Sequence, residues 1–117
     1  MHNTARRKEL VAEYQQARPE AGVYRIVNRM NNKVLTGSAL DLSRIRNKME
    51  FAASTNTTGV LDQRLHKDVR AFGIAAFALE VLAVFDTAPG MTAEEIQRNL
   101  ATLEELWREK TDPALRY

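Results

Sequence analysis

Cysteine is absent from this chain of 117 residues, and histidine occurs only twice. Without thiols the chain can form neither a disulfide framework nor a thiolate metal site. No apolar run approaches the roughly 18 residues of a membrane span, and residues 1–8 are polar and basic with no apolar signal segment after them. We therefore expect a soluble cytoplasmic protein with no membrane partner, and a length that suits one domain with its own core.

Charge of one sign is not in large excess, because the formal net charge is only +2. Its distribution is uneven, however: from position 25 to position 48 six basic residues accompany one acidic residue, which gives +5 there and −3 in the remainder. An electropositive segment attracts phosphate backbones whatever their sequence. A solvated basic face without a partner is the alternative. The candidate nucleic-acid-binding residues are Arg25, Lys33, Arg44, Arg46 and Lys48.

The segment 1–19 is expected to stand apart from the rest. Residues 4–16 show a thin apolar stripe at helical spacing, and Pro19 ends that pattern. The sequence therefore predicts an accessory N-terminal helix within 1–19 and a main domain over 20–117. Nothing in the composition decides whether this helix covers the main domain, pairs with another copy or serves as a tether.

A β-hairpin is predicted at the start of the main domain. Residues 22–27 and 33–38 alternate as strands do, and Asn31 and Asn32 between them tolerate the positive φ of a tight turn. If these two asparagines form the loop, Met30 lies opposite Lys33. That register fixes which side chains of the two strands share a face.

In that register Tyr24 and Leu35 lie on one face of the hairpin together with Gly37. Because glycine has no side chain, Gly37 is expected to leave open backbone beside the Tyr24 hydroxyl, where a ligand could approach closely. An ordinary half-buried tyrosine over a hairpin is the alternative interpretation.

Two helices are predicted next. Asp41 can cap a helix whose buried stripe includes Ile45 and Met49, while the basic residues of that helix fall off the stripe. A second helix follows and ends near Gly73, as a glycine at a helix C-terminus favours. His66 lies one residue past its apolar stripe, which favours a surface or half-buried role over a catalytic one.

A strand and a long helix complete the domain. Phe77–Phe85 alternates with largely apolar residues on both faces, so we expect this strand to be covered on both sides. Thr92 and Glu95 form a capping box that predicts a long helix to about Glu109. Glu104 lies at the edge of the apolar stripe of that helix, where a carboxylate can bind a metal or pair with an arginine.

The arrangement resembles the GIY-YIG nuclease family over most of residues 21–117. The hairpin opens Gly-Val-Tyr at 22–24 and returns to a motif that ends in Gly37, and the later helices and strand follow in the family's order. The run Lys-Val-Leu-x-Gly-Ser at 33–38 is similar to the subgroup associated with LuxR-like and ArsR-like bacterial regulators. The resemblance implies an α+β fold, with a small three-stranded antiparallel sheet flanked by helices and an extra N-terminal helix here.

The resemblance also implies chemistry, which this chain matches only in part. Active members hydrolyse phosphodiesters with one divalent metal, Mg²⁺ or Mn²⁺, held by a glutamate. Tyr24 matches the first tyrosine, Gly37 the motif glycine and Glu104 the metal-binding glutamate. The family's second tyrosine, arginine and histidine are replaced by three apolar residues, which cannot donate protons or carry charge: Leu35, Ile45 and Met49.

Three functions stay open at this stage. A catalytically impaired domain would act as a nucleic-acid-binding or regulatory module, with DNA as the expected partner. The alternative is an active metal-dependent endonuclease that hydrolyses DNA phosphodiesters, and a scaffold role is the third. The sequence does not decide the oligomeric state.

Overall fold

The computed structural model describes residues 19–117, so the predicted accessory helix at 4–16 lies outside the described residues. The elements of the described part, in chain order, are β1 (Ala21–Asn28), β2 (Val34–Ala39), α2 (Leu42–Thr55), α3 (Gln63–Phe72), a short 3-10 helix (Ile74–Ala76), β3 (Phe77–Phe85), α4 (Ala93–Glu109) and a second 3-10 helix (Pro113–Leu115).

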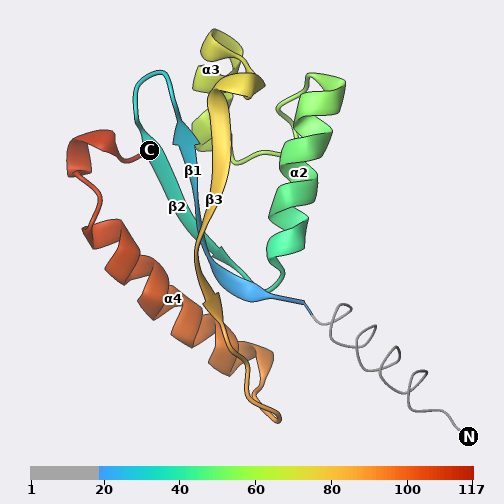
Figure 1. Ribbon diagram of the computed structural model, residues 1–117, viewed down its shortest axis with the longest axis vertical. Coiled ribbons are helices and arrows are strands. Elements are labelled where there is room, and N and C mark those ends of the chain that lie inside the picture. Colours follow the sequence, from blue (N-terminus) through green and yellow to red (C-terminus); the bar gives the residue numbers. More distant parts are fainter. Residues whose placement is uncertain (1–18) are drawn as a thin grey trace, which may run out of the picture.

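The three described strands form one antiparallel sheet with β1 in the centre, between β2 and β3. Figure 1 shows the sheet between α4 on one side and α2 on the other. The predicted α+β class, with a three-stranded antiparallel sheet flanked by helices, is confirmed. Each boundary lies within a few residues of the predicted one, and β3 matches its prediction at both ends.

The hairpin register differs from the predicted one. Tyr24 lies opposite Gly37 and Ile26 opposite Leu35, whereas the two-residue loop would have placed Tyr24 opposite Ala39. The connection is longer than predicted because the Asn28 amide donates to the Lys33 carbonyl, 2.8 Å away, which closes the turn earlier. The shift is by an even number of residues, so Tyr24, Leu35 and Gly37 still share one face.

Side-chain caps fix where the helices begin. The Asp41 carboxylate accepts from the Ser43 amide at 3.0 Å at the start of α2, as the sequence predicted. Thr92 accepts from the Glu95 amide at 3.1 Å and starts α4 in the same way. Each cap satisfies an amide that has no partner inside its helix, so the side chains of both helices are held in a defined register over the sheet.

The main hydrophobic core lies between the sheet and the two middle helices. Tyr24 and Met49 pack against this core as partly buried residues. On the opposite side α4 lies against β2 and β1, where Leu100 is 2% exposed. The face that carries Tyr24 is therefore the one covered by α2 and α3. The buried core residues are Ile26, Leu35, Ala52, Leu61, Leu65, Val69 and Phe77.

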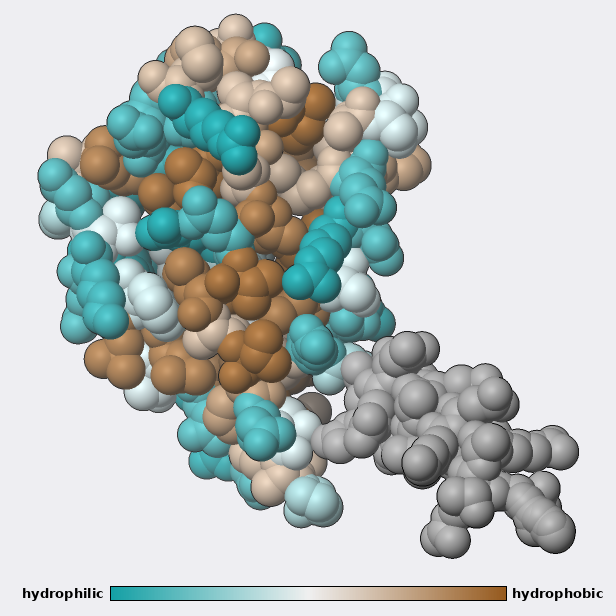
Figure 2. Space-filling model, in the orientation of Figure 1, coloured by the Kyte–Doolittle hydropathy of each residue, from teal (hydrophilic) through white to brown (hydrophobic). Residues whose placement is uncertain are grey.

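The prediction that β3 is covered on both sides is wrong. β3 is an outer strand of the sheet, and Val84 is 56% exposed. Figure 2 shows hydrophobic residues gathered over β3 and the neighbouring side of α4. The alternation found the strand but not the exposure of the face that carries Glu80 and Val84, because apolar side chains on a strand do not show which elements pack against them. No helix in residues 19–117 is long and apolar enough to cross a membrane.

Candidate functional site

Tyr24 fills the space that Gly37 leaves on the neighbouring strand. A Cβ atom built on Gly37 would lie 2.6 Å from the Tyr24 hydroxyl oxygen and 2.7 Å from Cζ, closer than real Cβ contacts. The expectation of open backbone for a ligand at Gly37 is therefore wrong, because the tyrosine ring occupies that position. Glycine is required here so that the ring can lie flat across β2.

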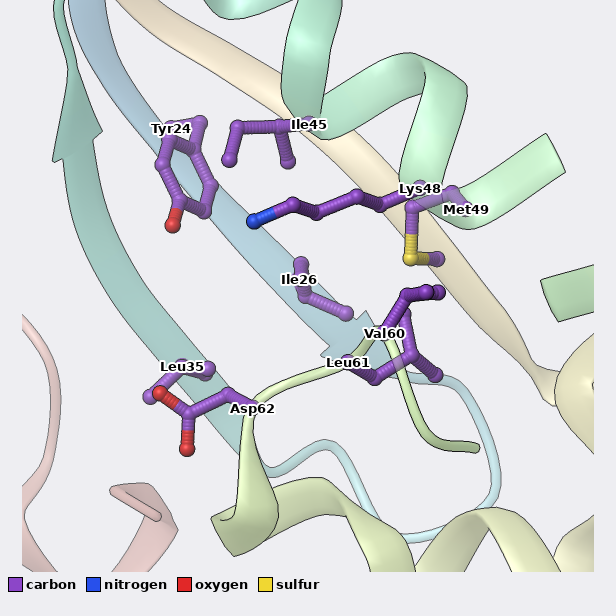
Figure 3. A pocket seen from close by; sticks show the side chains of 9 residues that line it. All are labelled: Tyr24, Ile26, Leu35, Ile45, Lys48, Met49, Val60, Leu61 and Asp62. Carbon is purple, nitrogen blue, oxygen red and sulfur yellow. The ribbon is translucent and has the colours of Figure 1, made fainter. Parts of the chain in front are cut away.

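A pocket of about 270 Å³ opens beside Tyr24. Figure 3 shows its walls, formed by β1 and β2, by α2 and by the segment that leads into α3. A hollow of this volume approaches the lower end of the size range of small-ligand sites. Its lining residues are Tyr24, Ile26, Leu35, Ile45, Lys48, Met49, Val60, Leu61 and Asp62.

The three positions that depart from the family pattern all lie in the wall of this pocket. Leu35 is 4% exposed and belongs to the hydrophobic core, and Met49 packs against that core. Ile45 lines the pocket beside Tyr24. The structure thus brings together the three positions at which the resemblance implies polar groups, and none of these three side chains carries a hydroxyl, imidazole or guanidinium.

Lys48 places a positive charge in the pocket. Its side chain extends from α2 across the hollow, and its ammonium points into the space beside Tyr24 (Figure 3). The sequence placed Lys48 off the buried stripe with Arg44 and Arg46, but it lies three residues after Ile45 and so borders that stripe. Lys48 is therefore the basic residue of α2 that enters the pocket, while the other two point elsewhere.

The Tyr24 hydroxyl is held in its protonated form. Burial raises the pKa of Tyr24 above its ordinary value of 10.0, and the negative charges of Glu104 and Asp62 raise it further, against an opposing effect of Arg64. At neutral pH the hydroxyl can therefore donate a hydrogen bond but does not supply a phenolate that could take a proton from water.

Glu104 is engaged by two neighbours. The Ser38 hydroxyl donates to Oε1 at 2.9 Å, and the Arg108 guanidinium donates to Oε2. Its side chain is 22% exposed, so Glu104 lies at the margin of the packed region as predicted, while Glu105 is exposed. Of the two roles left open for Glu104, metal binding or pairing with an arginine, the structure shows pairing with Arg108 of the same helix.

The described residues offer no cluster of ligands for a divalent metal. Within residues 19–117 no group of three or more histidine, cysteine, aspartate or glutamate side chains could hold a metal ion. Glu104 would be the single carboxylate ligand, and both of its oxygens already accept hydrogen bonds. Mg²⁺ can use one protein carboxylate when water and phosphate complete its octahedron, but here the Arg108 guanidinium competes for that carboxylate.

Sequence reasoning missed two ion pairs near Tyr24. Arg64 donates from Nε and Nη2 to Asp62 at 3.0 and 2.9 Å, and this pairing lowers the Asp62 pKa to about 2. Arg108, whose pKa is raised chiefly by Glu104, lies four residues after it. The spacing of Arg108 and Glu104 could have been read from the sequence, whereas the approach of Arg64 depends on how α3 packs.

The predicted nucleic-acid-binding residues do not form one uniform patch. Arg44 has a side chain that is 81% exposed, at 4.0 Å from Asp41, and Arg46 is exposed on the same helix. Arg25 forms an ion pair with Glu80 of β3, which offsets its charge. Lys33 lies at the far end of the hairpin, with its ammonium 5.7 Å from the ring centroid of Tyr117. The exposed basic surface nearest the pocket is therefore on α2.

Comparisons with known proteins support the fold. A point mutant of the catalytic domain of intron endonuclease I-TevI superposes with a TM-score of 0.56 at 20% sequence identity, over 78% of this chain and 82% of that one. The catalytic domain of homing endonuclease I-TevI superposes with a TM-score of 0.53 at 21% sequence identity, over 77% of this chain and 86% of that one. These likenesses agree with the GIY-YIG fold. No protein-family model matches the sequence, and no curated protein matches it either.

Proposed function

We propose that this chain is a nucleic-acid-binding domain with a GIY-YIG fold and an impaired hydrolytic site. The observation that carries the proposal is the apolar wall that Leu35, Ile45 and Met49 form beside Tyr24. Phosphoryl transfer depends on positioned charge more than on covalent chemistry. Loss of a single preorganised donor typically costs about 100- to 1,000-fold in turnover, so a wall without such groups supports binding rather than cleavage.

The basic side of α2 is the proposed contact surface. Arg44 and Arg46 are exposed there and Lys48 reaches into the pocket, so the three cations extend from solvent to Tyr24. Counterions released when such residues meet phosphates make the affinity fall steeply with salt. DNA is the proposed partner, because the structural neighbours are endonuclease domains.

A salt titration tests this function. Fluorescence anisotropy of a labelled DNA duplex, repeated at several salt concentrations, should give a linear decrease of log affinity with log salt. The double variant Arg44→Gln with Arg46→Gln should reduce that slope by about two. The matched control changes two exposed arginines on other helices, Arg70→Gln with Arg98→Gln. An affinity indifferent to salt, or equal effects of both double variants, would show that α2 is not the binding surface.

A divalent-metal-dependent endonuclease is the second candidate, and Lys48 favours it. Its ammonium lies in the pocket beside Tyr24 and could stabilise a developing negative charge in place of the family's arginine. Nicking of supercoiled plasmid in the presence of Mg²⁺ or Mn²⁺ would reveal this activity. Glu104→Gln should abolish it, while the control Glu105→Gln, which alters the next carboxylate and also loosens Arg108, should not. Nicking that survives Glu104→Gln would point to a contaminating nuclease.

Two finer assignments accompany the proposal. The link to the subgroup associated with LuxR-like and ArsR-like regulators rests on the run at 33–38, and cytoplasmic location is an expectation for a chain without cysteine. Both stay predictions. A fluorescent fusion expressed in a bacterium would test the location directly.

A further inference from the structure

A second, smaller cavity lies at the outer edge of β2. Its volume is about 40 Å³, and three guanidinium groups from separate parts of the chain line it: Arg64 from α3, Arg108 from α4 and Arg116 from the C-terminal segment. The main chain of that segment is fixed to β2, since the Tyr117 amide donates to the Val34 carbonyl at 3.1 Å. Three arginines are thereby held around one small space.

Some of the guanidinium N–H groups of these arginines form no hydrogen bond with the described residues. Arg64 uses Nε and Nη2 for Asp62, and Arg108 uses its two terminal nitrogens for Glu104 and Glu105. Arg116 uses Nε for the Thr111 carbonyl at 3.0 Å, and its terminal nitrogens have no acceptor among residues 19–117. Arg64 and Arg108 are thus paired with three carboxylates, whereas Arg116 bonds only a carbonyl oxygen and keeps a guanidinium without a carboxylate partner among the described residues.

Thr36 provides an independent sign of a missing ligand. It is 7% exposed, lines the same cavity, and its hydroxyl has no hydrogen-bond partner within the described part of the chain. Buried hydroxyl groups are nearly always paired, and an unpaired one carries a desolvation cost. A group with acceptor oxygens in the cavity would satisfy this hydroxyl and the free nitrogens of Arg116 together.

We propose that this cavity binds a phosphate group. A single water requires roughly 10 to 15 Å³ of such space, so 40 Å³ accommodates about three oxygens, which matches the part of a phosphate that faces a protein. Arginine donors suit phosphate geometry. The source that follows from the proposed function is a phosphodiester of the bound nucleic acid, because Leu35 lines both this cavity and the Tyr24 pocket. Free inorganic phosphate shares the same chemistry.

The first experiment titrates inorganic phosphate into the full chain and follows amide and arginine resonances by NMR. Arg116→Gln should weaken phosphate binding by about ten- to a hundredfold, as expected for loss of a charge-assisted hydrogen bond. The matched control is Arg98→Gln, an exposed arginine on α4, which should bind as the wild type does. If phosphate leaves the resonances of Arg116 and Thr36 unmoved, or if both variants bind equally, the proposal is wrong.

Thr36→Val supplies a second variant with a distinctive pair of effects. Valine keeps the shape and removes the unpaired hydroxyl, so the variant should melt at a higher temperature than the wild type in phosphate-free buffer. Its affinity for phosphate should fall at the same time. A variant that is less stable without phosphate, or that binds phosphate unchanged, would show that the hydroxyl already has a partner and would overturn the site.

The source of the phosphate is settled by the DNA titration. If a phosphodiester occupies the cavity, Arg116→Gln should reduce the salt slope of DNA binding by about one, and Arg98→Gln should not. Loss of free phosphate binding with an unchanged DNA slope would assign the cavity to free phosphate and overturn the nucleic-acid source. The proposed function fails separately, when wild-type DNA affinity is indifferent to salt while phosphate still binds.

Discussion

Gly37→Ala should show that this glycine serves the packing of Tyr24. The added Cβ would lie 2.6 Å from the tyrosine hydroxyl oxygen, so the ring must leave its place across β2 and turn toward the 270 Å³ pocket. Forcing a methyl group into a packed site typically costs about 1 to 3 kcal/mol. For a domain of this size each kcal/mol lowers the melting temperature by about 4 to 8 °C.

The sign of the effect should reverse when the ring is removed. Gly37 is not among the residues with positive φ, so alanine fits its backbone without strain. In a Tyr24→Ala background the same substitution should therefore stabilise the fold by about 0.4 to 1 kcal/mol, because alanine has less freedom than glycine in the unfolded chain. The coupling energy between the two positions is then about 1.5 to 4 kcal/mol.

Urea unfolding of the four proteins of this double-mutant cycle, followed by circular dichroism, measures that coupling. Gly22→Ala is the control, since its Cβ would collide with the backbone oxygen of Ala83, which cannot move without breaking the pairing of β1 and β3. Its cost should persist when Tyr24 is alanine. An equal cost of Gly37→Ala in both backgrounds would refute the packing explanation and restore the idea that Gly37 admits a ligand.

Three further predictions concern a cap and two titrating groups. Asp41→Ala removes the side-chain acceptor at the start of α2 and should lower the urea midpoint of unfolding, because the Ser43 amide loses its partner; an unchanged urea midpoint would contradict this. Arg64 holds the folded pKa of Asp62 at about 2, below its ordinary 3.8, so its stabilisation is present above pH 3.8 and is lost as the pH falls toward 2. Asp62→Asn should therefore make the melting temperature depend less on pH over that acid range. A dependence as steep as that of the wild type would contradict the pairing. Burial, then the hydrogen bond to Asp68, raises the pKa of Tyr117 to about 12, so its stabilisation is present below pH 10.0 and is lost as the pH rises through 12. Tyr117→Phe should reduce the decrease in melting temperature that occurs as the pH rises above 10. An unchanged decrease would show that Tyr117 does not titrate in the folded protein.

Local signals predicted most of the elements. The alternation at Phe77–Phe85 gave both ends of β3, and the cap at Thr92 gave the start of α4. The face shared by Tyr24 and Gly37 was also correct although the register was not, because the period of two preserves parity when the loop grows by an even number of residues. The loop length was wrong because the predicted two-residue turn requires positive φ at both asparagines. In the structure Asn32 adopts positive φ, at 62°, and Asn31 does not.

Packing between distant elements could not be read in the same way. Arg64 influences the charge around Tyr24 because the N-terminus of α3 lies beside β1 and β2, and no spacing along the chain shows that approach. The apolar replacements at Ile45 and Met49 were visible in the sequence, but the space beside them was not. The position of Lys48 in the pocket could not be predicted for the same reason, because only the structure shows how far its side chain reaches.

The apolar wall links the proposed impairment of the hydrolytic site to the packing of the core. Leu35 is a core residue, and Met49 packs against the same core, so a polar side chain at either position would be desolvated unless it found a partner. The described neighbours of the pocket offer few partners, since Asp62 is committed to Arg64 and Glu104 to Arg108. Introducing one polar side chain alone at either position would therefore leave it buried and unpaired, at a cost of about 1 to 3 kcal/mol. Under the proposed function, a variant would gain hydrolysis only if several of these contacts changed together, whereas binding of phosphates by the exposed cations of α2 would leave the present core intact.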